Sequence, residues 1–290
     1  MSDEEPRHDV IDLSDNEFND NGEAQSHISV LKVFGIPLVL YDFQNHLMPD
    51  TPLNMQIIDA AVSCYMHTYI LEDRRDRNLC MAFTSCFLQV FNRRTPIPRS
   101  RARLITFTSN LTLPLNESPS KKLPANASAS DQLQQAPIEK LSLVVFPLIV
   151  DSYHWALLVF CFHRKKCFYF DERIGRDIQL QPAHGAFFAI TVFFKELWNV
   201  EPGSWSFVDV APPPPHEDVW GPHVHCAQSC GVNVLQVIHR LLRNFRRTPD
   251  PASLEMAYPP ICLCASYRTV IDETLRNGGV PVAYVGLNLT

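Results

Sequence analysis

No apolar run in the 290-residue sequence reaches the roughly 20 residues that a helix needs to cross a bilayer, so we do not expect a membrane protein. The N-terminus opens with acidic residues, where a secretory signal would show basic and then apolar ones. The nine cysteines are an odd number and lack the spacing of a disulfide framework. The sequence therefore predicts a nuclear or cytoplasmic protein, or one of both compartments, that is not secreted and keeps reduced thiols.

Basic residues are almost absent from positions 1–30, which hold nine acids and one base, Arg7. The formal net charge of -6 thus divides into -8 for this segment and +2 for the rest. A segment so acidic and so poor in large apolar side chains cannot bury enough surface to offset its ordering entropy. We expect a disordered acidic tail over residues 1–29 and one folded domain over 30–290. The small charge of that domain gives no support for a nucleic-acid partner.

The apolar pattern of the folded part alternates between helical and strand-like stretches. Residues three or four apart predict helices over 53–71, 79–91, 187–198 and 231–245. Continuous apolar runs predict strands over 141–150, 154–162 and 167–170, of which the last two flank a basic turn and form a hairpin. Residues 109–137 are rich in Ser, Asn, Pro and Gln and indicate a surface insertion. The expected fold class is α+β, with helices around a mostly antiparallel central sheet.

Three residues that carry chemistry lie at the ends of predicted elements. Cys230 begins a helix, where the positive end of the helix dipole favours the thiolate, and Gly231 lets the backbone approach a substrate carbonyl. His154 opens one hairpin strand and Asp171 closes the other, so both lie near one end of the sheet. A histidine oriented by a carboxylate is the base that a cysteine nucleophile needs. Each residue alone is equally consistent with a buried cysteine, a strand-end histidine or a turn aspartate.

Together these residues make the sequence resemble the ubiquitin-like-protein proteases, which are SUMO-specific cysteine peptidases related to the adenovirus protease. His154-Trp155 opens a strand, Asp171 closes the next, and Cys230-Gly231 follows at a helix start. Upstream, Leu53-Asn54 is similar to the Leu-Asn that precedes a helix in that family.

The resemblance implies a papain-like cysteine peptidase fold with the catalytic residues in the order His, Asp, Cys. It implies that Cys230 attacks the carbonyl of the C-terminal glycine of SUMO or a related modifier. His154 would act as base and then acid, and Asp171 would orient it. Trp155 and Gly231 would contact the Gly-Gly tail of the modifier. No cofactor is implied, and the partners are the modifier and its conjugates; no membrane partner is expected.

Three positions depart from the family pattern. One is Ser229, which stands just before Cys230 where the family often has an aspartate. Pro52 stands where the family usually has a tryptophan that walls the tail tunnel, and Val224 stands where it has an oxyanion-hole glutamine. A shifted loop would let Gln228 act as that donor instead, with the Cys230 amide as the second donor. These departures leave open a second interpretation, a catalytically impaired SUMO-binding adaptor that keeps the protease fold.

Two histidines and a cysteine precede Cys230 closely, at His223, His225 and Cys226. Four nitrogen and sulfur ligands within eight residues could form a tetrahedral zinc site. The spacing is not that of a familiar zinc-binding pattern, because it lacks a second, separated ligand pair. We therefore expect no metal.

A short apolar island interrupts the acidic tail at Val10, Ile11, Asp12 and Leu13, followed by further acids. A branched apolar segment of this kind adds to an exposed sheet edge of a partner, while the flanking acids meet basic residues. It resembles a SUMO-interacting motif. The alternative is a chance apolar patch in a disordered tail.

Overall fold

The computed structural model describes residues 10–11, 30–48, 51–71, 79–82, 85, 141–151, 154–174, 181–212, 229–247, 254–259 and 264–285. Most of the acidic tail and the whole 109–137 insertion lie outside these ranges, so both stay predictions. Within the ranges, no helix is long and apolar enough to cross a membrane.

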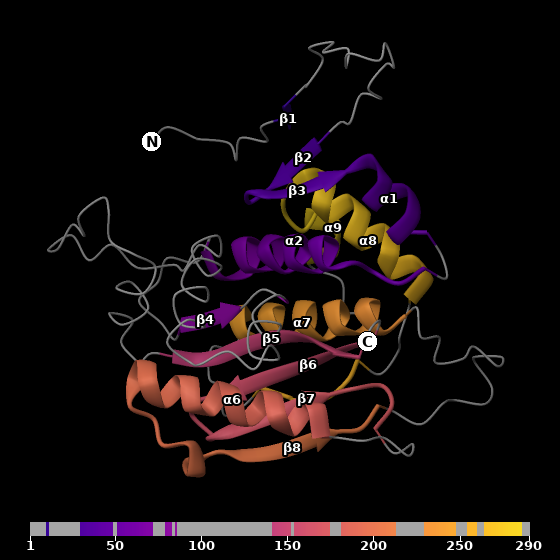
Figure 1. Ribbon diagram of the computed structural model, residues 1–290. Coiled ribbons are helices and arrows are strands. Elements are labelled where there is room, and N and C mark those ends of the chain that lie inside the picture. The colour runs from indigo at the N-terminus through magenta and orange to yellow at the C-terminus, as the bar shows by residue number, and fades with distance from the viewer. Residues whose placement is uncertain are drawn as a thin grey trace, which may run out of the picture.

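A five-stranded mixed sheet forms the centre of the molecule (Figure 1). Its strands lie in the order β4 (Leu79–Ala82), β5 (Leu141–Asp151), β6 (His154–Cys161), β7 (Lys166–Phe170) and β8 (Ser206–Val210). The central strands β5, β6 and β7 pair antiparallel, and β6 and β7 form the expected hairpin. Both outer strands pair parallel with their neighbours. The expectation of a mostly antiparallel sheet thus holds only for the centre, because long crossovers connect the outer pairs.

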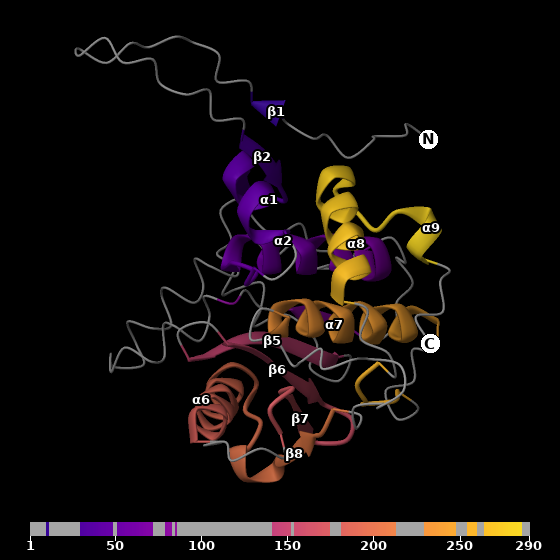
Figure 2. The ribbon, with the colours of Figure 1, turned by 90° about the vertical axis from the view of Figure 1, so that its right-hand side faces the viewer.

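Helices cover both faces of this sheet (Figures 1 and 2). On β6, Leu157 and Val159 pack into the core beneath the helices α2 and α7, whereas Leu158 and Phe160 pack toward α6. Every residue of β6 is buried, which explains its continuous apolar run. One face is covered by α6 (Gln181–Trp198), and the other by α7 (Cys230–Arg247) together with α2 (Met55–Met66). The helix α8 (Cys264–Asn277) packs on the outside of α2 and α7.

A small three-stranded sheet lies at the N-terminal side of the domain, in the order β1 (Val10–Ile11), β2 (Val30–Val33) and β3 (Ile36–Val39). All its pairings are antiparallel. The short helix α1 (Leu40–His46) follows β3 directly. The remaining short elements are a π-helical turn after α2 (His67–Leu71), a 3-10 turn before β8 (Pro202–Ser204) and the helix α9 (Val282–Val285).

The Leu-Asn pair sets the start of α2. The Asn54 side chain caps the helix by accepting from the Ile57 amide at 2.9 Å, and it donates to Asp42 at 2.6 Å. Asp42 in turn accepts from the Val39 amide at 2.8 Å, at the start of α1. Asn54 therefore ties α2 to α1, which fixes the backbone of the preceding Leu53.

The predicted helix over 79–91 is wrong in its first part, because residues 79–82 form β4 and pair parallel with β5. A short apolar run does not distinguish a buried strand from a buried helix by periodicity. Residues 86–91 lie outside the described part of the chain. No disulfide forms among the cysteines whose side chains are described, which are Cys64, Cys80, Cys161, Cys167 and Cys230.

Candidate active site

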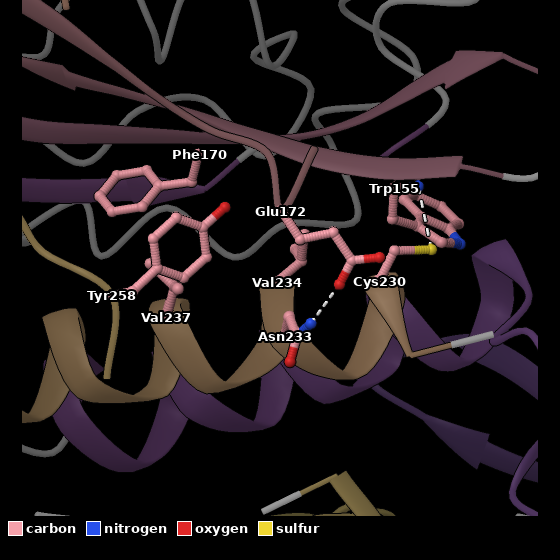
Figure 3. A pocket seen from close by; sticks show the side chains of 8 residues that line it. All are labelled: Trp155, Phe170, Glu172, Cys230, Asn233, Val234, Val237 and Tyr258. Atoms are coloured by element: carbon pink, nitrogen blue, oxygen red, sulfur yellow. Dashed lines mark hydrogen bonds between the residues drawn. The ribbon is translucent and has the colours of Figure 1, made fainter. Parts of the chain in front are cut away.

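Cys230 is the first residue of α7, and its side chain is buried between this helix and the sheet. The backbone amide of Trp155, on β6, donates to Cys230 Sγ at 3.3 Å (Figure 3). Both this amide and the N-terminal end of the helix dipole favour negative charge on the sulfur. The local fold therefore fixes the sulfur at the helix start, next to the backbone of β6.

His154 and Asp171 meet at one end of the β6–β7 hairpin. The register pairs Leu157 with Phe170. Asp171 follows Phe170 directly and His154 lies three residues before Leu157, so both lie at the same edge of the sheet. The ring Nε2 of His154 lies 2.8 Å from Asp171 Oδ1. Because Nε2 is engaged by the carboxylate, Nδ1 is the ring nitrogen that remains for Cys230.

The Asp171 carboxylate is buried and accepts several hydrogen bonds. Beyond His154, the Tyr169 hydroxyl donates to it at 2.6 Å, the Arg173 backbone amide at 2.8 Å and the Arg173 guanidinium at 3.2 Å. Burial alone would raise the pKa of this carboxyl, but the bonds from His154, Arg173 and Tyr169 outweigh it and lower the pKa. Asp171 is therefore ionised at neutral pH.

The pKa of His154 is raised to about 9. Burial lowers this pKa, but the hydrogen bonds to Asp171 and Cys230, together with their charges, raise it by more. The ring therefore carries a proton at neutral pH and faces the sulfur as an imidazolium. A histidine held beside a cysteine sulfur is the group that exchanges a proton with such a nucleophile.

Gly231 lies where three elements converge. A Cβ at this position would lie 3.1 Å from the Leu53 Cβ, 3.1 Å from the Trp155 Cδ1 and 3.4 Å from the Ile58 Cδ1. The Trp155 indole donates to the Leu53 carbonyl at 2.9 Å, which locks this contact. Only glycine lets α7 come this close to the start of α2 and to β6.

We expect Gly231→Ala to lower kcat by about 10²-fold, because a shift of roughly 1 Å in a reacting group has an effect of this size. The added methyl must push against the Leu53 Cβ, which sits on the fixed start of α2, or against the locked Trp155 ring. Steady-state kinetics check this result. Gly203→Ala is the matched control, since a Cβ there meets nothing within 4 Å; equal losses in both variants would contradict the packing argument.

A small pocket runs from Cys230 along α7, between the helix and the end of β7 (Figure 3). It brings in residues that the sequence did not single out, Glu172, Asn233 and Tyr258. Asn233 donates a hydrogen bond to the Glu172 carboxylate. Two signals in the sequence point to this pair: Glu172 directly follows Asp171, and Asn233 lies one helical turn after Cys230, on a neighbouring face of α7.

The other predicted site residues are placed only in part. Trp155 lines the pocket beside Cys230 and is 4% exposed, whereas Pro52 precedes the fixed Leu53. Gln228 and Val224 lie outside the described residues, so the oxyanion-hole prediction is untested, as is the zinc alternative at His223, His225 and Cys226. Among the side chains that the structure describes, no group of three His, Cys, Asp or Glu could hold a metal ion.

A buried thiol at a helix start and a histidine fixed by a carboxylate, on a helix-flanked sheet, define the class of the protein as a cysteine peptidase. The comparisons with known proteins refine this class. The model of the Ulp1 protease family, C-terminal catalytic domain, matches residues 52–177. That range contains His154 and Asp171 and ends before Cys230. No curated protein sequence matches the chain.

Solved structures with the same fold are SUMO proteases. The Ulp1-like SUMO protease catalytic domain of Chaetomium thermophilum has a TM-score of 0.54 at 21% identity, covering 86% of this chain and 82% of that one. The C-terminal Ulp1 protease domain, solved in complex with SMT3, the yeast ortholog of SUMO, has a TM-score of 0.51 at 17% identity, covering 83% and 84%. The chain therefore shares the fold of these proteases, and its residues 52–177 match the model of the Ulp1 protease family.

Proposed function

We propose that the chain cleaves after the C-terminal Gly-Gly of SUMO or a related ubiquitin-like modifier. Its main reaction would be removal of the modifier from lysine conjugates, with precursor processing as a second use of the same step. The single observation that carries the proposal is the alignment of Cys230 with the hydrogen-bonded His154–Asp171 pair. The complex of a Ulp1 protease domain with SMT3 supports the choice of modifier.

The Cys230 thiolate attacks the carbonyl carbon of the terminal glycine and forms a tetrahedral intermediate. The His154 imidazolium then gives its Nδ1 proton to the leaving lysine nitrogen, the C–N bond breaks, and a thioester remains. Water enters, His154 takes one of its protons, and the resulting hydroxide displaces the Cys230 sulfur to release the carboxylic acid. The Cys230 amide, with Gln228 as a proposed second donor, would stabilise the oxyanion.

The narrow approach to the nucleophile supports a substrate that ends in two glycines. Gly231, Leu53 and Trp155 are packed against one another beside Cys230, so a tail without side chains would meet the least steric resistance on its way to the sulfur. Trp155, which lines the pocket at Cys230, would contact that tail from one side. Pro52, which precedes Leu53, would offer the modifier tail less contact surface on its other side than a tryptophan at this position would.

A panel of fluorogenic substrates tests the proposal. SUMO, ubiquitin and one further modifier, each carrying a C-terminal coumarin amide, are compared with a SUMO–lysine isopeptide. The account expects turnover of the SUMO substrates with a kcat/KM at least about tenfold above ubiquitin. Binding of SUMO without turnover of any substrate would instead favour the adaptor interpretation that Pro52 and Val224 motivate.

We further propose that Val10, Ile11, Asp12 and Leu13 form a SUMO-interacting motif. The backbone of Val10–Ile11 pairs antiparallel with β2, with Val10 opposite Leu31 and Ile11 opposite Val30 (Figure 1). This extended pairing supports the proposal, because the motif would bind SUMO by the same strand addition. β1 is the outer strand of this sheet and uses one of its two backbone edges for β2. We propose that SUMO pairs with that same edge, so that β2 and SUMO compete for it.

A peptide of residues 1–20 is therefore expected to bind SUMO more tightly than the same motif in the whole chain. In the whole chain, β2 competes with SUMO at an effective concentration of about 1 mM. It lowers the apparent affinity of the motif for SUMO if the dissociation constant of the β1–β2 pairing is below that concentration. Fluorescence anisotropy and titration calorimetry measure the two affinities. The double substitution Val10→Ala with Ile11→Ala should sharply weaken the binding of the peptide to SUMO. Ser26→Ala in the whole chain serves as the control. Unchanged binding of the doubly substituted peptide would contradict the proposed motif.

A further inference from the structure

We propose that Glu172 and Asn233 are positioning residues of this active site. Their hydrogen bond, called here the β7–α7 bridge, holds the first turn of α7 against the turn that follows β7. The first turn of α7 carries Cys230, and the turn after β7 begins with Asp171. The proposal rests on the cysteine peptidase chemistry proposed above, but not on the identity of the modifier.

The β7–α7 bridge is built into the interior rather than laid over the surface. Glu172 is 6% exposed, and a buried carboxylate is costly unless it is hydrogen-bonded. The Asn233 side-chain amide donates to one of its oxygens, while the other oxygen points along the pocket toward Cys230 (Figure 3). The pair therefore forms part of the wall beside the nucleophile.

Each partner is coupled to a catalytic residue by a short stretch of ordered backbone. Glu172 lies in a tight turn in which the Arg173 amide donates to the Asp171 carboxylate and the Ile174 amide donates to the Asp171 carbonyl at 3.0 Å. On the helix, the Asn233 amide donates to the Ser229 carbonyl at 2.9 Å and so closes the turn that contains Cys230. A displacement of either partner would move a catalytic residue with it.

The bridge completes a triangle of hydrogen bonds among the three elements that carry the catalytic residues. His154 and Asp171 join β6 to β7, and the Trp155 amide joins β6 to Cys230 on α7. The bridge joins the third pair, β7 and α7. With all three sides present, the positions of thiol, imidazole and carboxylate are fixed relative to one another. Without the third side, the first turn of α7 can shift along the sheet.

Asn233→Ala and Glu172→Ala are each expected to lower kcat by about tenfold or more and to change KM by less than about twofold. The reason is that the bridge aligns the nucleophile and does not lie in the path proposed for the modifier tail. SUMO with a C-terminal coumarin amide serves as substrate. Asn277→Ala is the matched control, because it removes an asparagine side-chain bond, to the Glu273 carbonyl, on a different helix.

A swap of the two side chains distinguishes positioning from a general loss of stability. Asn233→Asp alone sets two carboxylates against each other and should lose kcat at least as strongly as Asn233→Ala. Adding Glu172→Gln restores an amide–carboxylate hydrogen bond in the opposite direction. The double variant should recover about half or more of the decrease in log kcat that Asn233→Asp causes.

The rate at which iodoacetamide alkylates Cys230 is expected to rank these variants in the same order as kcat does, and this measurement needs no modifier. If SUMO is the wrong substrate, wild-type turnover is absent but the variants still differ in alkylation rate, so the two failures are distinguishable. A double variant as slow as Asn233→Asp in alkylation, or an Asn233→Ala variant with wild-type alkylation and kcat, overturns the proposal.

Discussion

Cys230→Ala is expected to lower turnover by at least about 10⁴-fold while SUMO binding persists, because loss of the nucleophile removes the covalent step entirely. The substitution deletes one sulfur that accepts from the Trp155 amide and leaves the hairpin with His154 and Asp171 intact. Single-turnover cleavage of the coumarin amide and SUMO binding by calorimetry measure the two effects.

Cys161→Ala is the matched control for this prediction. Cys161 is a buried core cysteine at the far end of β6 from His154, so its loss should cost stability and leave kcat within a few-fold of wild type. Cleavage that persists in Cys230→Ala would show that another residue is the nucleophile.

Asp171→Ala is expected to lower kcat by about 10³-fold and to move the alkaline limb of the pH–rate profile to lower pH. The sign follows from His154, whose pKa is raised to about 9 by its bonds to Asp171 and Cys230. The imidazolium that protonates the leaving amine is present below this pKa and lost above it. Without the carboxylate the pKa falls, so activity declines at a lower pH.

Asp171→Asn separates orientation from charge. An asparagine still accepts from the His154 ring and holds its orientation, but it carries no charge to stabilise the imidazolium. We expect a smaller loss of kcat than in Asp171→Ala and a similar downward shift of the alkaline limb. A profile of kcat from pH 5 to 10 checks both points, and an unshifted limb would contradict the assigned role of Asp171.

The raised pKa of His154 also has a consequence for stability. The folded state binds the His154 proton more tightly than the unfolded chain does, so this proton stabilises the fold fully below about pH 6.5. That contribution is lost as the pH rises through about 9. Asp171 behaves in the opposite way, since its lowered pKa gives stability at neutral pH that is lost as the pH falls.

Those parts of the site that depend on local order along the chain could be predicted from the sequence. A hairpin returns the chain on itself, so the spacing of His154 and Asp171 was enough to bring them to one edge. The predicted start of a helix was enough to place Cys230 at the positive end of the helix dipole. The resemblance to a known family added the order of these residues and the need for glycine at position 231.

Contacts between distant segments could not be predicted in this way. Glu172 and Asn233 lie 61 positions apart. Each lies close to a catalytic residue in the sequence, but nothing in the sequence indicates that the two bind each other. The buried His239 is a second case, because its two ring nitrogens lie 2.6 Å and 2.7 Å from the hydroxyls of Tyr69 and Tyr267, which other helices supply. Burial lowers the pKa of His239 to about 3, a state that periodicity along α7 does not reveal.

Covalent trapping tests the assignment of Cys230 as the nucleophile that reacts with the modifier. SUMO in which the terminal carboxyl is replaced by an electrophile is incubated with the protein, and the adduct is mapped by mass spectrometry after digestion. The account predicts one adduct, on Cys230, that is lost in Cys230→Ala and formed far more slowly in His154→Ala. An adduct on another cysteine, or no adduct while the probe is bound at saturation, would contradict it.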